Sequence, residues 1–282
     1  MFRNDFHINT LIKLALSEDI GGGDITSRPL IPNRLNGKAV IIAKQSGILV
    51  GLDVAKMVYR MVDKNTIFRP LKRDGDRVKV GQKIALIHGK VISLLSAERT
   101  ALNFLQRLSG IATLTSKYVE KVKVTKTKIL DTRKTTPGLR VLEKYAVKMG
   151  GGKNHRMGLY DMFLIKENHI KAAGGIGEAI RKARSKKRKT KIEVEVRNLK
   201  EVIEAVASSP DWIMLDNMNP GEMIKAVNLI RSENPGIKIE ASGGVSLKNV
   251  RRIALTGVDF ISIGALTHSA PALDLSLILI EP

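Results

Sequence analysis

Short apolar runs rich in β-branched residues recur beyond about residue 110 and alternate with segments long enough for a helix. Six such runs lie at Lys128–Leu130, Met162–Ile165, Ile192–Val196, Trp212–Leu215, Ile237–Ile239 and Phe260–Ile263. Each gap between them can hold one crossover helix, which is the pattern of a parallel array of βα units. No Gly-x-Gly-x-x-Gly turn follows the first run, so a dinucleotide-binding open sheet is not supported. The pattern predicts an incomplete α/β barrel.

The first 110 residues show a mixed pattern instead of this alternation. A helix is expected over Ile8–Glu18, where apolar residues recur at helical spacing, and a second over Leu94–Leu108. Short β-like runs lie between them at Lys38–Lys44, Ile48–Val50 and Lys83–His88. We therefore expect two domains, the first over residues 1–110 and the α/β barrel over residues 111–282.

The charge of the chain is strongly positive, which narrows the kinds of partner to consider. Lys and Arg number 48 against 27 Asp and Glu, giving a formal net charge of +21 over 282 residues. Such a charge favours a polyanionic partner, either nucleic acid or small phosphorylated substrates, unless surface lysines serve solubility alone. Aromatic residues make up only 4% of the chain, too few for the base-stacking platforms of single-strand binders. We expect no nucleic-acid partner.

Cysteine is absent, which excludes disulfides, thiolate metal sites and a cysteine nucleophile. The opening MFRNDFHINT lacks the apolar core of a signal peptide. No apolar run approaches the roughly 18 residues that a membrane-spanning helix requires. We expect a soluble cytoplasmic protein with no membrane partner.

The ends of the predicted barrel strands carry charged and small residues. In α/β barrels, the chemistry gathers where the strands end. The strand-end residues are Asp131, Lys166, Glu195, Asp216, Ser242 and Gly264. One charged residue at a strand end would be unremarkable, whereas a whole ring of them indicates a site.

The segment Asp131–His169 holds the densest group of basic residues near these strand ends. Its cationic side chains are those of Arg133, Lys134, His155, Arg156 and Lys166. They could converge if the glycine loop at residues 150–152 folds back over the barrel mouth. Arginine forks suit carboxylates, and lysine supplies a point charge. The alternative is a solvated basic loop.

The carboxylates of Glu195 and Asp216 are placed to hold a metal ion. Glu193 and Glu195 alternate with apolar residues, so both face one side of their strand, with Glu195 nearer the open end. Asp216 closes the next strand. Carboxylates on adjacent strand ends suit Mg²⁺, held directly or through water. Either could instead pair with Lys or Arg inside the barrel.

Small residues follow the last two strands, where barrels often bind phosphate through exposed backbone N–H groups. They are Ser242, Gly243, Gly244 and Gly264. His268 lies just beyond and could touch the same anion, or it could be a lone surface histidine.

The basic run Arg181–Lys191 is predicted to end a helix at the opposite rim, as a solvated face rather than a nucleic-acid site.

Arg99 stands in a mostly apolar helical stripe with Leu95, Leu102 and Gln106. An arginine in such a place is either at the edge of the buried face or held at an interface by an anion. The spacing alone favours the edge.

Nearly the whole chain resembles the quinolinate phosphoribosyltransferase family, the type II phosphoribosyltransferases of NAD synthesis. The motifs that carry the resemblance are EDIGGGDIT, AERTALNFLQRLSGIAT, DTRKTTPGLR, EKYAVKMGGGKNHRMGLYDMFLIKENH, EVEV, IMLDN, EASGGV and ISIGALTHSAPALD. The resemblance implies an N-terminal α/β sandwich domain, an incomplete α/β barrel and a C-terminal tail that returns to the first domain. It also implies a homodimer, or a multiple of dimers, with shared active sites.

The resemblance further implies an activity and roles for residues. The enzyme would transfer phosphoribosyl from 5-phosphoribosyl 1-pyrophosphate to quinolinate with decarboxylation, giving nicotinate mononucleotide, pyrophosphate and CO₂. Quinolinate's carboxylates would meet Arg133, His155, Arg156 and Lys166, with Thr132 and Lys134 beside them. Glu195 and Asp216 would meet the ribose hydroxyls and Mg²⁺. The 5′-phosphate would meet Ser242, Gly243, Gly244, Gly264 and His268.

By the same resemblance Arg99 would enter the neighbouring subunit's site, and Lys134, Glu195 and Asp216 would be the catalytic residues. Two alternatives stay open at this point. One is a paralogous phosphoribosyltransferase with a different acceptor. The other is a basic, non-catalytic protein that binds phosphate or nucleic acid.

Overall fold

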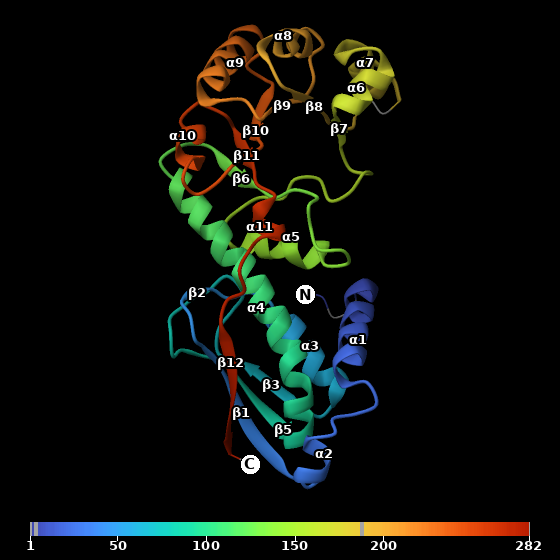
Figure 1. Ribbon diagram of the computed structural model, residues 1–282, viewed down its shortest axis with the longest axis vertical. Helices are drawn as coiled ribbons and strands as arrows, with labels where there is room; N and C mark the ends of the chain where they lie inside the picture. The colour runs from blue at the N-terminus through green and yellow to red at the C-terminus, as the bar shows by residue number, and fades with distance from the viewer. Residues whose placement is uncertain (1, 3–4, 187–188, 282) are drawn as a thin grey trace. The chain divides into compact units, whose positions relative to one another are not determined.

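A computed structural model of the chain describes residues 2, 5–186 and 189–281. The chain divides into two compact units (Figure 1). The first unit comprises residues 1–114, 137–150 and 270–282, and the second comprises residues 115–136 and 151–269. In the described part of the chain, no helix has the length and apolar character needed to cross a bilayer.

The first unit is built on a four-stranded antiparallel sheet in the order β12-β1-β5-β3. Its strands are β1 (Asn36–Ala43), β3 (Ile67–Pro70), β5 (Lys83–Lys90) and β12 (Leu275–Glu281), with a small antiparallel pair of β2 (Gly47–Ile48) and β4 (Arg77–Val78). Its helices are α1 (Phe6–Ile20), α2 (Ser27–Leu30), α3 (Leu52–Val62), α5 (Arg140–Met149) and the first part of α4 (Val91–Val122). The last strand of the chain therefore completes the sheet of the first unit.

The predicted helix Leu94–Leu108 is the middle of the longer helix α4. Its buried positions continue past Gly110 to Ile111, Tyr118 and Val122, so the apolar face does not stop at the glycine. A Cβ at Gly110 would lie 2.0 Å from the carbonyl oxygen of Pro271. Gly110 therefore allows the chain before β12 to pass close to the helix.

The second unit holds a six-stranded sheet in the order β6-β11-β10-β9-β8-β7, and all of its strand pairs are parallel. The strands are β6 (Lys128–Leu130), β7 (Phe163–Ile165), β8 (Ile192–Val196), β9 (Trp212–Asp216), β10 (Lys238–Ser242) and β11 (Phe260–Ser262). The predicted parallel α/β array is thus confirmed. The strands follow an arc, and the sheet order leaves β6 and β7 at its two edges (Figure 1).

Helices follow most of these strands, as the spacing predicts. They are α6 (Glu167–Ala173), α7 (Ile176–Lys186), α8 (Leu199–Ala207), α9 (Pro220–Glu233), α10 (Val250–Ala254) and α11 (Ala265–His268). The sequence marks their starts clearly: Asn219 and Glu222 form a capping box around Pro220 at the first turn of α9. The helices α7 to α11 bury apolar residues on one side, whereas α6 has no buried residue.

The gap between β6 and β7 differs from the expected crossover. Its helix, α5, belongs to the first unit, where Glu143 pairs with Arg107 at 2.7 Å and the Tyr145 hydroxyl donates to Asp74. These contacts join residues far apart in sequence, so strand spacing carries no sign of them.

Every residue of β8 is buried. Strands of a parallel sheet are covered on both faces and are usually apolar throughout. The sequence IEVEV instead places two carboxylates, Glu193 and Glu195, on the inner side of the arc. Carboxyl groups buried in this way need partners, and those partners define the site.

Candidate active site

A cavity of about 820 Å³ opens at the carboxyl ends of the strands and lies entirely within the second unit. Thirteen of the fourteen residues predicted for the site line it: Thr132, Arg133, Lys134, His155, Arg156, Lys166, Glu195, Asp216, Ser242, Gly243, Gly244, Gly264 and His268. They come from segments that span more than a hundred residues of sequence. The fourteenth, Arg99, is exposed on α4 in the first unit.

The loop before His155 folds back along strand β6, whereas from the sequence we expect the glycine loop at residues 150–152 to fold over the barrel mouth. The Lys153 amide donates to the Ile129 carbonyl at 2.8 Å, and the Asp131 amide donates to the Lys153 carbonyl at 3.2 Å. The buried Asp131 carboxylate then accepts a hydrogen bond from the His155 backbone at 2.9 Å and another from the Asn154 side chain. This loop is therefore part of the sheet edge rather than a solvated tail.

Arg156 is the most constrained of the cations. One of its terminal nitrogens donates to the Met162 carbonyl at 3.0 Å. Burial, and then the nearby positive charge of Arg133, lower the pKa of Arg156. Its Nε is buried and has no hydrogen-bond partner among the described residues. A guanidinium that keeps an unsatisfied buried donor beside a second arginine is suited to receive a carboxylate.

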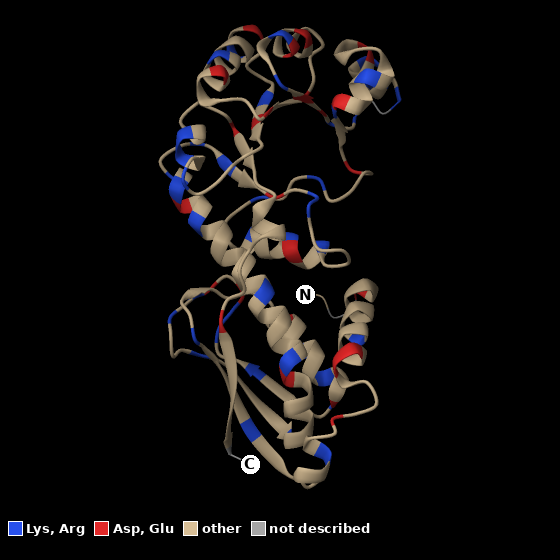
Figure 2. Ribbon diagram, viewed as in Figure 1, with Lys and Arg blue, Asp and Glu red and all other residues tan. Residues whose placement is uncertain are grey.

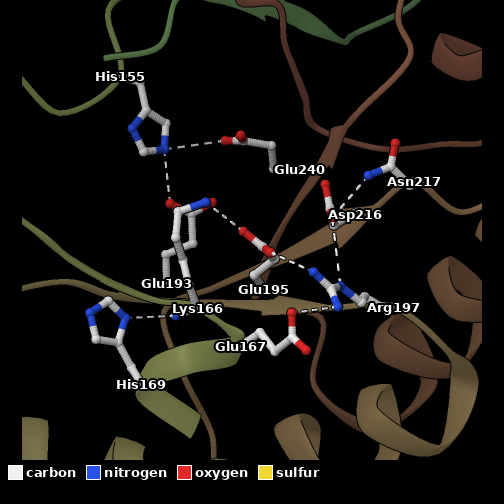
Figure 3. Close-up of polar contacts among 10 residues, drawn as sticks. All are labelled: His155, Lys166, Glu167, His169, Glu193, Glu195, Arg197, Asp216, Asn217 and Glu240. Carbon is white, nitrogen blue, oxygen red and sulfur yellow. Dashed lines mark hydrogen bonds and ion pairs between the residues drawn. The ribbon is translucent and has the colours of Figure 1, made fainter. Parts of the chain in front are cut away.

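His155 reaches inward to two buried glutamates, as Figure 3 shows. Its Nε2 lies 2.8 Å from Glu193 Oε2 and 3.5 Å from Glu240 Oε2. Burial raises the pKa of both carboxyl groups, and the charge of Glu193 raises that of Glu240 further. The three side chains offer ligand atoms within 4.8 Å of one another, a spacing that could also hold a metal ion. That arrangement would displace the hydrogen bond between His155 and Glu193.

Glu195 and Asp216 end neighbouring strands, and two cations lie against them (Figure 3). Lys166 Nζ donates to Glu195 Oε2 at 2.7 Å. Arg197 approaches Glu195 at 4.0 Å and Asp216 at 3.8 Å, while it pairs with Glu167 at 2.6 Å. The expected alternative, in which these carboxylates pair with basic residues, is therefore also present. Their oxygens remain the donor type that Mg²⁺ prefers.

The glycines beyond β10 and β11 leave room for close approach of a ligand to the backbone. Gly243 has φ +92°, and a Cβ there would lie 2.1 Å from the Asn217 side-chain oxygen. Gly244, at φ +60°, has open space at the Cβ position. A Cβ on Gly264 would crowd the Lys134 side chain at 2.9 Å and the His268 ring at 3.2 Å. These three glycines therefore form a small-residue wall of the cavity, in which Gly264 lies next to Lys134 and His268.

The described residues of the basic run 181–191 do not line this cavity, and Lys187 and Arg188 fall outside the described ones. Arg181 pairs with Glu178 at 2.6 Å, and Arg184 pairs with Asp211 at 2.8 Å. Basic residues are spread over helices and loops of both units (Figure 2). The run thus forms local surface ion pairs, as expected for a solvated face.

Comparison with known sequences decides the family. Sequence models of quinolinate phosphoribosyl transferase match residues 24–109 for the N-terminal domain and residues 111–278 for the C-terminal domain. The chain belongs to the quinolinate phosphoribosyl transferase family.

Relatives of this family are similar over almost the full chain. A Synechocystis protein named probable nicotinate-nucleotide pyrophosphorylase (carboxylating) is 47% identical over 264 residues, which cover 93% of this chain and 89% of that protein. A Bacillus subtilis protein of the same name is 44% identical and covers 97% and 94%. The solved structure of the nicotinate-nucleotide pyrophosphorylase from Francisella tularensis has a TM-score of 0.93 at 44% identity, covering 97% and 96%.

Membership in the quinolinate phosphoribosyl transferase family confirms the resemblance that the motifs indicated, together with the α/β fold class. Sequence reasoning missed three polar residues that line the cavity, namely Asn217, Glu240 and Ser262. Asn217 is one of the described non-glycine residues with positive φ, at 55°, and follows Asp216 directly. Glu240 lies in the middle of β10, and Ser262, which is the last residue of β11, falls inside the predicted run Phe260–Ile263, so neither carried a strand-end signal.

Proposed function

We propose that the chain transfers the phosphoribosyl group of 5-phosphoribosyl 1-pyrophosphate to quinolinate and releases CO₂ and pyrophosphate, forming nicotinate mononucleotide. The single observation that carries this is the convergence in one cavity of basic side chains, a carboxylate pair and a glycine wall. Each group suits one part of the two substrates. Curated relatives whose names state this reaction support the same activity.

Quinolinate is a diacid, and its two carboxylates suit the basic part of the cavity. Arg133, Arg156 and Lys166 supply charge there, with His155 and Thr132 beside them. A hydrogen bond to a charged group contributes about 1.5–3 kcal/mol, so several converging ones can hold a diacid that would otherwise stay in water. The unsatisfied Nε of Arg156 supports a carboxylate at that position.

The sugar and its phosphates suit the opposite part of the cavity. Glu195 and Asp216 would meet the ribose hydroxyls, and the glycine wall with Ser242 and His268 would accept the 5′-phosphate through backbone N–H groups. Lys134, next to Gly264, would lie against the pyrophosphate and neutralise it as it leaves. A neutralised leaving group lowers the barrier to its departure.

Mg²⁺ fits the carboxylate pair by the chemistry of its donors, because Glu195 and Asp216 offer hard oxygen ligands on adjacent strands. When bound, the ion supplies charge neutralisation for the pyrophosphate. Lys166 and Arg197 lie against the same oxygens. For direct binding of the ion they would have to move aside. If they stayed in place, the carboxylates would contact the ion through water.

The chemistry then needs no covalent intermediate with the protein. As the bond from C1 to pyrophosphate lengthens, C1 acquires positive charge, which the nearby carboxylates favour. The pyridine nitrogen of quinolinate, held in line by the basic residues, forms the new bond to C1 and becomes positively charged. That charge stabilises the electron pair left on C2 when the adjacent carboxylate departs as CO₂. C2 then takes up a proton from the solvent, which completes nicotinate mononucleotide.

We also propose a homodimer, or a multiple of dimers, in which Arg99 of one subunit completes the site of the other. Arg99 is exposed and belongs to the first unit, whereas every residue that lines the cavity belongs to the second unit. This supports a role of Arg99 at a shared site. We expect the protein to act in the cytoplasm. The names of the two bacterial relatives carry no organelle, whereas those of several plant relatives specify mitochondria or chloroplasts.

The deciding experiment measures release of labelled CO₂ from quinolinate in the presence of phosphoribosyl pyrophosphate and Mg²⁺. We expect release with quinolinate and no product with nicotinate as acceptor. Product from nicotinate but none from quinolinate would instead assign a different acceptor. Salt-dependent retention on DNA without any pyrophosphate release would assign a non-catalytic binding protein.

A further inference from the structure

Two carboxyl groups lie inside the second unit and have no part in the reaction proposed above. Glu193, in β8, and Glu240, in β10, are both fully buried. Glu193 Oε1 and both carboxyl oxygens of Glu240 lack a hydrogen-bond partner among the described residues. Burying a carboxyl group is unfavourable unless it is paired, so two of them side by side need a reason.

The side chain that both glutamates approach is His155, which lines the cavity. Nε2 of His155 is 2.8 Å from Glu193 and 3.5 Å from Glu240. The ring also meets Trp212 edge-on, with 6.1 Å between centroids at 90°. Its backbone amide is held by Asp131. His155 is thus held by groups from β8, β9 and β10 and from the end of β6. Its side chain is only 6% exposed.

We propose that Glu193 and Glu240 are positioning residues, which hold His155 by Nε2 in the orientation that the substrate diacid requires. This inference rests on the proposed function. A carboxylate at hydrogen-bond distance from one ring nitrogen fixes the tautomer and the plane of a histidine. Glu193 does this directly, and Glu240 adds a second, weaker contact behind it.

The position of the pair also limits the repulsion between these two carboxyl groups and a negatively charged substrate. Glu240 reaches the cavity lining, whereas Glu193 lies behind it. Burial, and then the charge of Glu193, raise the pKa of the Glu240 carboxyl, which favours its neutral form and reduces its repulsion of a dicarboxylate. The pair can therefore orient His155 without weakening the positive field of Arg133, Arg156 and Lys166.

Two variants of similar size separate orientation from mere packing. Glu193→Leu removes the acceptor, whereas Glu193→Gln keeps an oxygen that can accept from Nε2–H. We expect Glu193→Leu to raise the KM for quinolinate at least about tenfold and to leave the KM for phosphoribosyl pyrophosphate within about twofold. Glu193→Gln should stay within about threefold for both, and Glu240→Leu should fall between the two.

The control is Thr127→Val, which removes a buried hydrogen bond to the Val258 carbonyl at the opposite end of the same sheet. It lowers stability without touching His155, so both KM values should match the wild type. Equal increases in both KM values for Glu193→Leu, or an unchanged quinolinate KM, would overturn the proposal.

A measurement on the substrate-free protein gives an independent answer. The chain has five histidines, so the ring signals of protein labelled with ¹⁵N-histidine can be assigned with His155→Gln. We expect a slowly exchanging Nε2–H signal for His155 that Glu193→Leu loses and that Glu193→Gln and Thr127→Val keep. Persistence of the signal in Glu193→Leu contradicts the proposal.

Should Glu193→Leu fail to fold, Glu193→Gln still decides. Retention of the Nε2–H signal together with a near-normal quinolinate KM supports the proposal, and loss of the signal with an unchanged KM overturns it. Failure of the proposed function would look different, because the wild type itself would then release no CO₂ from quinolinate while the histidine signals remained measurable.

Discussion

Lys166 and Glu195 form an ion pair across the ends of β7 and β8, with 2.7 Å between Nζ and Oε2. Glu195 is largely buried, with 8% of its side chain exposed, whereas Lys166 is half-exposed at 49%. In the proposed function, Lys166 meets quinolinate and Glu195 meets the ribose. The pair therefore joins the two halves of the cavity, and a change in one residue should be felt by both substrates.

Lys166→Met tests that coupling. The substitution keeps the length of the side chain and removes its charge, so quinolinate loses a cation and Glu195 loses its partner. We expect the KM values of quinolinate and phosphoribosyl pyrophosphate each to rise about tenfold, measured as initial rates with either substrate varied. Lys171→Met, on the exposed surface of α6, is the matched control and should change neither. An effect on quinolinate alone would show that the ion pair does not couple the two subsites.

Arg133→Ala should affect quinolinate alone. Arg133 is exposed at the cavity, so its loss leaves the fold intact, and the far-ultraviolet circular dichroism should match the wild type. Removing one or two charge-assisted hydrogen bonds of about 1.5–3 kcal/mol each should weaken quinolinate binding by one or more powers of ten. Isothermal titration calorimetry with quinolinate measures this directly. Wild-type affinity in the variant would refute the role assigned to Arg133.

Several of the site residues that the sequence identifies lie at, or directly after, the ends of strands that the apolar pattern already marks. Asp131, Lys166 and Asp216 are examples, and their convergence follows from parallel strands ending at one edge. Glu240 lies in the middle of β10, and Ser262 falls inside the predicted run Phe260–Ile263; within a strand a polar residue can equally well face a neighbour in the core. Only the packing of several strands around one side chain shows that Glu240 faces His155.

The placement of α5 escaped prediction for a related reason. Its sequence gives an amphipathic helix in the gap after β6, and such a helix normally covers its own sheet. The buried Glu143 instead meets Arg107, which lies on α4 in the first unit. Pairing between residues 36 positions apart depends on the assembled fold and leaves no local pattern.

Mixing two inactive variants tests whether sites are shared between subunits. Arg99→Ala and Lys166→Ala should each lack activity in pure form. In a symmetric dimer, half of the randomly mixed dimers are mixed, and one of their two sites has neither substitution. Mixing equal amounts under conditions of subunit exchange should therefore restore roughly a quarter of the wild-type activity. Different affinity tags on the two variants confirm that mixed dimers form, and continued inactivity of purified mixed dimers would contradict the shared site.

The buried Glu240 predicts a stability that falls as pH rises. Its pKa is raised from 4.5 to about 8, because burial penalises the charged carboxylate and Glu193 is close. The unfolded chain releases this proton near the ordinary value, so between these limits the folded state holds a proton that the unfolded state lacks. The free energy of unfolding should then decrease with pH, by at most about 1.4 kcal/mol per pH unit from this group.

Glu240→Gln replaces the titrating carboxyl group with a neutral amide. The free energy of unfolding of this variant should therefore decrease less steeply with pH. Urea unfolding of the wild type and the variant at several pH values across this range gives the two curves. Their difference cancels the contribution of titrating groups that the substitution leaves unchanged, and it includes the effect on Glu193, whose pKa burial also raises. Parallel curves would show that Glu240 titrates at its ordinary value in the folded protein.

Gly110→Ala tests the close approach between α4 and the chain that leads into β12. Alanine is a better helix former than glycine, so at a site with open space the substitution would raise the free energy of unfolding by up to about 1 kcal/mol. Here the added Cβ would lie 2.0 Å from the Pro271 carbonyl oxygen and 3.1 Å from the Ala272 Cα, both of them backbone atoms. Overpacking of this kind costs about 1–3 kcal/mol or more, and part of the β12 pairing would be lost if the segment moved away. We expect the melting temperature to fall by about 2 °C or more. Gly22→Ala, where the Cβ meets nothing within 4 Å, is the control and should leave the melting temperature unchanged. A melting temperature for Gly110→Ala at or above that of the wild type would show that the segment before β12 can shift freely without weakening the first unit.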